Sequence, residues 1–188
     1  MSIKKISFLG VYVGLIILFT FVPYTGYINI NFMAFTIMPF FVVLATYHLG
    51  FAGAIISSAS FGVGSFLRAL YFGNFIMSNP MTSILSRVIL GVVVYLTYIC
   101  IPKKNFTNNL MVTIIAFIMN AVLVSSFFLF SDLSFEKAGL YKTSIFWFGK
   151  ILLNFCIEIS LGTFLYCITH RFFFAPNSIF SINSKNNW

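Results

Sequence analysis

Long apolar runs follow one another along almost the whole chain and leave little room for a soluble domain. Of the 188 residues, 60% are hydrophobic and only 7% are charged, whereas about a quarter of the residues of an ordinary soluble domain are charged. A membrane-crossing helix needs about 20 consecutive apolar residues. The runs predict an all-α integral membrane protein, a six-transmembrane-helix bundle with spans at residues 6–22, 32–49, 51–70, 80–101, 110–130 and 144–174.

The spans are expected to form one domain, residues 1–175, followed by a poorly ordered cytoplasmic tail at residues 176–188. The net charge of +8 comes mostly from bases near span ends, which favours a role in membrane orientation over nucleic-acid binding. The positive-inside rule then predicts that both termini are cytoplasmic, although Lys137 and Lys142 fall on the outer side. The bases counted as cytoplasmic are Lys4, Lys5, Lys103, Lys104, Arg171 and Lys185.

Two arginines, Arg68 and Arg87, lie at the edge of or within apolar spans, on either side of Asn79 and Pro80. A charge at bilayer depth costs at least ~2.5 kcal/mol, so such a residue faces protein, water or a ligand. Arg68 falls at the outer end of its span. Arg87 falls seven residues beyond Pro80, which places it about 10 Å into the membrane at about 1.5 Å per residue.

Lys150 and Asn154 of the last span are expected at a depth in the membrane comparable to that of Arg87. They lie one helical turn apart and therefore on one face of the helix. Together with the arginines they predict an outward-facing pocket with excess positive charge. Such a pocket suits an anionic ligand, whose carboxylate an arginine can hold with two hydrogen bonds. The predicted lining consists of Arg68, Asn79, Thr82, Arg87, Trp147, Lys150 and Asn154.

A structural explanation of these charges stays open. Arg87 can form an interhelical ion pair with Glu158, which lies near the middle of the last span, while Arg68 and Lys150 extend to the outer headgroups. Glu158 can equally pair with Lys150. Asn120, in the middle of the fifth span, is of a type that commonly forms interhelical hydrogen bonds.

The segment between the first two spans, residues 24–31, is uncharged and aromatic. It suits either an ordered cap over the pocket or a plain loop, and an interfacial aromatic belt is the simplest explanation of its tyrosines. Pro39, in the second predicted span, indicates a kink or an irregular helix start. The third span is rich in Gly and Ser, which predicts close packing of backbones.

The first span carries Gly10 and Gly14, whose spacing lets another helix approach closely. That helix can belong to the same bundle or to a partner protein. The sequence contains no H-E-x-x-H, no G-x-S-x-G and no nucleotide-binding glycine loop. Its three cysteines, Cys100, Cys156 and Cys167, lack the spacing of a metal site or a disulfide framework and are expected to be core or lipid-facing thiols. We therefore expect neither catalysis nor a metal.

One pattern resembles a known family. It reads Pro39…Gly50-x-x-Gly53…Phe61-Gly62-x-x-Ser65-Phe66-Leu67-Arg68-Ala69…Asn79-Pro80…Ser83-x-Leu85-x-Arg87-x-x-x-Gly91. It is similar to the substrate-binding S component of energy-coupling factor (ECF) vitamin transporters, most of all to the pantothenate-type members. Those members have an N-P-x-x-S-x-x-P-R-x-x-x-G run, in which Ser86 here replaces a proline. The resemblance is sharp over residues 39–91.

The resemblance implies a six-helix bundle in a bacterial cell membrane that captures a vitamin from outside. The first loop, with Tyr24, Tyr27 and Asn31, would act as a lid. The subunit would then topple in the membrane when a transmembrane coupling subunit and two cytoplasmic ATPases act on it. Gly10 and Gly14 match the spacing at which family members dock the coupling subunit. The chain itself would need no cofactor, since its partners use the ATP.

Other functions stay open on the sequence alone. Related S components bind hydroxymethylpyrimidine, folate, riboflavin and other vitamins, and a single sequence separates these ligands badly. A membrane enzyme acting on a lipid substrate would use Glu136, Lys137 and Lys142 as surface groups, but it lacks a recognisable nucleophile or metal constellation. A channel is disfavoured, because the polar residues gather in one half of the spans and do not line a continuous path.

Overall fold

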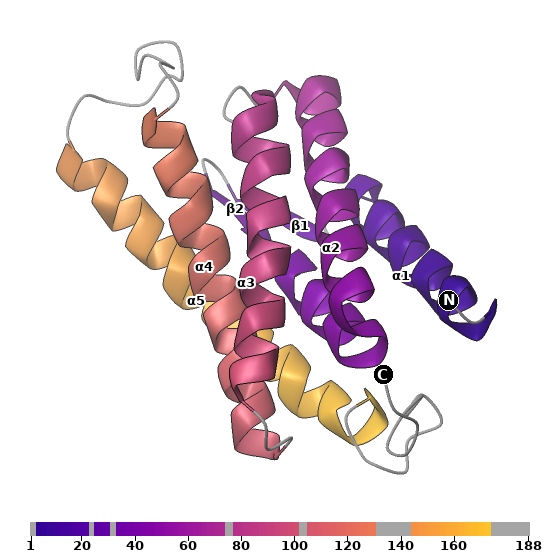
Figure 1. The fold of residues 1–188 in the computed structure, drawn as a ribbon. Coiled ribbons are helices and arrows are strands. Elements are labelled where there is room, and N and C mark those ends of the chain that lie inside the picture. The colour runs from indigo at the N-terminus through magenta and orange to yellow at the C-terminus, as the bar shows by residue number, and fades with distance from the viewer. Residues whose placement is uncertain are drawn as a thin grey trace.

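The computed structural model describes residues 3–22, 25–30, 33–73, 77–101, 105–130 and 144–173. Helices dominate these ranges, and one β-hairpin lies among them (Figure 1). The elements are α1 (Ile3–Phe21), β1 (Tyr27–Ile30), β2 (Met33–Thr36), α2 (Met38–Phe72), a π-helical turn η1 (Met81–Leu85), α3 (Ser86–Cys100), α4 (Phe106–Phe130) and α5 (Ser144–Phe173). The predicted tail, residues 176–188, lies outside the described residues.

Within the described ranges, three helical segments are long and apolar enough to cross a membrane, namely Met38–Phe72, Met81–Cys100 and Phe106–Phe127. The helical fold class is therefore confirmed, and a membrane location fits it. Two further apolar helices, Lys5–Phe21 and Phe155–Thr169, are shorter. Large apolar side chains such as Leu67, Leu96 and Leu152 are exposed on the outside of the bundle, as expected of helices that face lipid.

Helix α2 contains the second and third predicted spans, joined at Gly50. Gly50 has φ 64° and ψ −141°, which interrupts the helix between residues 38–49 and 51–72. A Cβ added to Gly53 would lie 2.2 Å from the carbonyl oxygen of Ala45, although residues eight apart in a straight helix are separated by about 12 Å. The two arms of α2 therefore fold back on each other at Gly50.

The first arm of α2 is shorter than the sequence predicted. Residues 32–49 were expected to span the membrane, but Met33–Thr36 form β2 and the helix begins only at Met38, with Pro39 in its first turn. The irregular helix start predicted from Pro39 is thus confirmed. Twelve residues reach about 18 Å, less than the ~30 Å hydrocarbon core, so this arm does not cross a membrane alone.

The hairpin links α1 to α2. Tyr27 pairs with Thr36 and Ile30 with Met33 in an antiparallel register. Aromatic and β-branched residues such as Tyr27 and Thr36 favour extended backbone. Strand β2 contacts α5, and in Figure 1 the hairpin passes behind α3 towards α4 and α5. Of the two expectations for this segment, an ordered cap or a plain loop, the described part is ordered.

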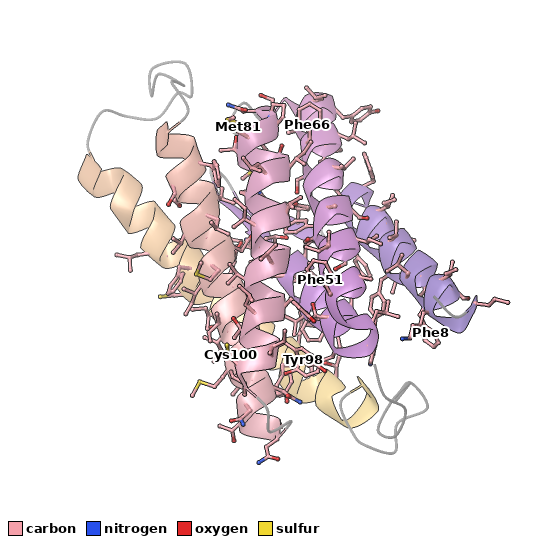
Figure 2. All side chains as sticks on the ribbon, viewed as in Figure 1. Phe8, Phe51, Phe66, Met81, Tyr98 and Cys100 are labelled. Atoms are coloured by element: carbon pink, nitrogen blue, oxygen red, sulfur yellow. The ribbon has the colours of Figure 1, made fainter. Side chains whose placement is uncertain are left out.

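The two ends of the bundle can be named from the labelled residues of Figure 2. The upper end carries Phe66 and Met81, and Tyr98 and Cys100 lie towards the lower end. The start of α1 and the end of α5 both lie towards the lower end (Figure 1). The described chain therefore begins and ends towards the same end of the bundle.

Small residues let α2 pack closely on its neighbours, as predicted. A Cβ on Gly62 would lie 3.0 Å from the Cα of Ile84, and one on Gly64 would lie 3.1 Å from the Thr20 hydroxyl oxygen. On the α3 side, a Cβ on Gly91 would lie 2.2 Å from the Ser58 hydroxyl oxygen. These contacts hold the second arm of α2 against both α1 and the η1–α3 segment.

Candidate functional site

Arg87 is buried at the start of α3 and is only 2% exposed. Its Nη1 donates to the Thr82 carbonyl oxygen at 2.7 Å and to the Ser86 hydroxyl at 3.1 Å. Its guanidinium carbon lies 4.9 Å from the centre of the Phe61 ring on α2. Its Nε is buried and finds no acceptor among the described residues.

The turn before α3 explains this position. Asn79 begins the turn, because its Oδ1 accepts a hydrogen bond from the Met81 backbone N–H at 3.0 Å. The Thr82 hydroxyl donates to the Asn79 carbonyl oxygen at 3.1 Å. The following π-helical turn has i to i+5 spacing, and the Arg87 side chain folds back onto the carbonyl of Thr82, five residues earlier. Asn79 and Thr82, both predicted ligand contacts, thus shape the start of this helix.

Arg68 lies near the upper end of α2 and is half-buried. Its guanidinium carbon stands 4.4 Å from the ring centre of Tyr27 and 5.4 Å from that of Phe72, so the cation lies over two aromatic faces. Cation–π contact of this kind contributes about 0.5–2 kcal/mol. Its Nη1 is buried without a hydrogen-bond partner in the described part of the chain.

Tyr27 of β1 stands between the two arginines. It is 8% exposed, and its hydroxyl forms a hydrogen bond with the Ser65 hydroxyl of α2. It interacts electrostatically with Arg87, Arg68 and Glu158, and it is within hydrogen-bonding reach of Arg87. The described part of the predicted lid therefore enters the bundle and contacts the arginines.

Glu158 of α5 closes the far side of the cluster. It is 3% exposed, and its Oε1 accepts a hydrogen bond from the Thr36 backbone N–H of β2 at 3.0 Å. Asn120 of α4 is 4% exposed and within hydrogen-bonding reach of this carboxylate, yet its own Oδ1 has no partner among the described residues. Helix α5 thus brings the Glu158 carboxylate, and helix α4 the unpaired Asn120 Oδ1, towards the side of the bundle where the hairpin lies.

The ion pair that the sequence left open between Arg87 and Glu158 is not formed. In the described part of the chain the Arg87 guanidinium donates to a carbonyl, a hydroxyl and a thioether sulfur, with the Tyr27 hydroxyl also within reach. Arg87 and Glu158 still influence each other electrostatically. Arg87 is therefore a buried cation without a carboxylate in contact, within the part of the chain that the structure describes.

Three buried polar atoms of this cluster have no hydrogen-bond partner among the described residues, namely Arg68 Nη1, Arg87 Nε and Asn120 Oδ1. Leaving a buried donor or acceptor unpaired costs about 1–3 kcal/mol, and more for a charged group. Two of the atoms are cationic donors on α2 and α3, and the third is a neutral acceptor on α4. Their chemistry is complementary to a molecule that carries an anionic group and a hydrogen-bond donor.

Several predicted residues lie outside what the structure describes. These are Tyr24 and Asn31, and the side chains of Trp147, Lys150 and Asn154. Their part in the site stays a prediction. Of the predicted residues that are described, the structure brings Arg68, Arg87 and Tyr27 together.

Gly10 and Gly14 lie on an open face of α1. Both are exposed, and a Cβ added to either would meet nothing within 4 Å among the described residues. Of the two partners that the sequence left open, a helix of the same bundle or one of another protein, the described residues show no helix packed against this pair. The face is free for lipid or for another protein.

Phe61 and Ser65 are part of the cluster, although sequence reasoning did not single them out as site residues. With Arg68 they occupy positions i, i+4 and i+7 of α2, which lie on one helix face. That spacing was the available signal. Hydroxyl and aromatic residues on the same helix face as an intramembrane arginine indicate the face on which the guanidinium finds its contacts.

Neither a comparison with protein-family models nor one with curated proteins gives a match for this chain. The family resemblance therefore depends on the residues quoted from the sequence.

Proposed function

We propose that this chain is the substrate-binding S component of an ECF-type vitamin importer and that its ligand carries a carboxylate. One observation carries the proposal: Arg87 is 2% exposed, has an unpaired Nε, and contacts no carboxylate of the described residues. Arg68 adds a second unpaired guanidinium N–H beside the same tyrosine. A ligand carboxylate would supply an acceptor for the unpaired N–H group of each guanidinium.

Pantothenate is our best candidate for the ligand. It has a carboxylate for the arginines, and its hydroxyl and amide N–H groups can donate to the free Oδ1 of Asn120. The pantothenate-type pattern over residues 39–91 favours the same choice. Folate shares the anionic character, whereas neutral vitamins such as riboflavin or hydroxymethylpyrimidine leave the cations unpaired.

We place the upper end of the bundle outside the cell, with both termini in the cytoplasm. In a variant whose Cys100, Cys156 and Cys167 are replaced by alanine, we expect Tyr71→Cys to react with a membrane-impermeant maleimide in intact cells. Thr107→Cys should react only after the membrane is permeabilised. Both positions are exposed. Labelling of Thr107→Cys alone in intact cells would reverse the orientation.

The partners are a transmembrane coupling subunit and two cytoplasmic ATPases, which would use ATP to topple the loaded subunit. The open α1 face at Gly10 and Gly14 suits close approach by a helix of the coupling subunit. We regard the chain as a binding subunit and not as an enzyme, and it needs no cofactor of its own.

The identity of the ligand is tested by mass spectrometry of small molecules that co-purify with the detergent-solubilised protein. We expect pantothenate, or another water-soluble acid, in near-stoichiometric amount, and less of it in Arg87→Met. Recovery of lipids alone, together with turnover of a lipid substrate by the purified protein, would favour a membrane enzyme.

A further inference from the structure

Tyr27 of β1 lies along the same face of α2 that carries Arg68. Its hydroxyl is hydrogen-bonded to the Ser65 hydroxyl, and its ring faces the Arg68 guanidinium, whose carbon is 4.4 Å from the ring centre. Ser65 and Arg68 are three residues apart and are therefore neighbours on one helix face. Tyr27 is thus fixed at its hydroxyl end and supports the cation on its ring.

Tyr27 is the more enclosed of the two aromatic supports of Arg68. Phe72 lies 5.4 Å from the same guanidinium carbon, but it is 56% exposed at the end of α2, whereas Tyr27 is 8% exposed. A cation–π contact is stronger where its groups are removed from water. Without the Tyr27 ring, the Arg68 side chain would be free to extend towards the polar headgroups, as long basic side chains near helix ends do.

The ring of Tyr27 also borders the support of Arg87. Its centre is 6.3 Å from that of Phe61, a separation at which two rings interact. Phe61 in turn lies 4.9 Å from the Arg87 guanidinium carbon. The ring pair of Tyr27 and Phe61 therefore carries one guanidinium on each member and connects the positions of the two cations.

We propose that Tyr27 is a positioning residue that keeps the Arg68 guanidinium where it can meet the carboxylate of the ligand. This inference rests on the proposed function, namely that the arginines bind a carboxylate. Because the tyrosine acts through Arg68, its ring should matter for an anionic ligand and much less for a neutral ligand of similar shape. The hairpin then contributes to the recognition of charge, although the charges themselves lie on α2 and α3.

Three variants separate the ring of Tyr27 from its hydroxyl and from general packing. Tyr27→Leu removes the aromatic face beside Arg68. Tyr27→Phe keeps that face and loses only the hydroxyl. Tyr95→Leu is the matched control, because the half-buried Tyr95 ring contacts the Phe51 ring at a centre distance of 5.0 Å. Tyr95 lies eight residues beyond Arg87 on α3, which is about 12 Å along the helix.

A fluorinated ring gives a test that does not depend on packing. Pentafluorophenylalanine at position 27 fills nearly the same space as phenylalanine, but its fluorine atoms withdraw the negative charge from the ring face that attracts a cation. It should lose the support of Arg68 as Tyr27→Leu does, while its melting temperature stays close to that of Tyr27→Phe. This variant tests the inference even if Tyr27→Leu fails to fold.

The experiment measures Kd for pantothenate and for panthenol, its neutral alcohol analogue, by titration calorimetry on the purified full-length protein. We expect the preference for the acid to narrow about tenfold in Tyr27→Leu and in the fluorinated variant. The affinity for panthenol should change much less, because a neutral ligand does not use the cation. Tyr27→Phe should keep most of the native preference, and Tyr95→Leu should keep all of it.

The outcomes separate this inference from the proposed function. If the native protein binds neither compound, or binds both alike, the proposed function fails. If the native protein prefers the acid and the fluorinated variant keeps that preference, only the inference about Tyr27 is overturned. An equal loss of preference in Tyr27→Leu and Tyr27→Phe also overturns it, since the hydroxyl and not the ring would then be responsible.

Discussion

Replacing Arg87 by methionine is expected to weaken pantothenate binding at least about 100-fold while the melting temperature stays within a few degrees of the native value or rises. Methionine is apolar and keeps part of the length of the side chain, but it lacks the guanidinium. Hydrogen bonds between charged groups contribute about 1.5–3 kcal/mol each, and about 2.8 kcal/mol corresponds to 100-fold. Titration calorimetry and thermal unfolding in the same detergent measure the two effects.

Stability should survive this substitution because Arg87 has no carboxylate in contact. Exchanging a buried charge for an apolar side chain of similar size is often neutral or stabilising. Arg87→Lys serves as the control, since it keeps the charge with fewer and differently placed donors and should bind with intermediate affinity. A melting temperature more than 10 °C lower with binding intact would make Arg87 a structural residue.

Replacing Gly53 by alanine is expected to destabilise the fold by about 3 kcal/mol or more. The new methyl group would lie 2.2 Å from the Ala45 carbonyl oxygen and 2.7 Å from the Leu49 Cβ, so the two arms of α2 cannot fold back as closely at Gly50. The loss is measured by thermal unfolding and by size-exclusion chromatography of the solubilised protein.

Gly10→Ala is the matched control for Gly53→Ala. It adds the same methyl group to an apolar helix, but at a position with nothing within 4 Å. Its stability should be equal to the native value or slightly higher, because alanine favours helix over glycine by up to ~1 kcal/mol. Equal tolerance of both substitutions would contradict the tight reversal of α2.

The helices could be predicted from the sequence because their signals are local. Long apolar runs mark them, Pro39 marks an irregular start, and Gly50 lies where the chain reverses. The strand at Met33–Thr36 was missed. In so apolar a chain, residues 33–36 suit either a membrane helix or a buried strand. They form a strand because they pair with Tyr27–Ile30.

The site could be predicted only in part. Intramembrane charge pointed to Arg68 and Arg87, because a cation in an apolar span needs a physical reason. Their meeting point at Tyr27 could not be predicted, since it depends on how the hairpin folds into the bundle. The hydrogen-bond partner of Glu158 could not be predicted either, because it is the backbone N–H of Thr36. Every residue except proline has such a donor, so the residue type does not reveal it.

The central claim is that the buried cation Arg87 is paired by the carboxylate of the ligand. It is tested most directly by measuring Kd for pantothenate and for its neutral alcohol analogue, panthenol, with the native protein and with Arg87→Met. We expect the native protein to prefer the acid at least about 100-fold and the variant to bind both alike. Equal binding of acid and alcohol by the native protein, or an unchanged preference in the variant, would contradict the claim.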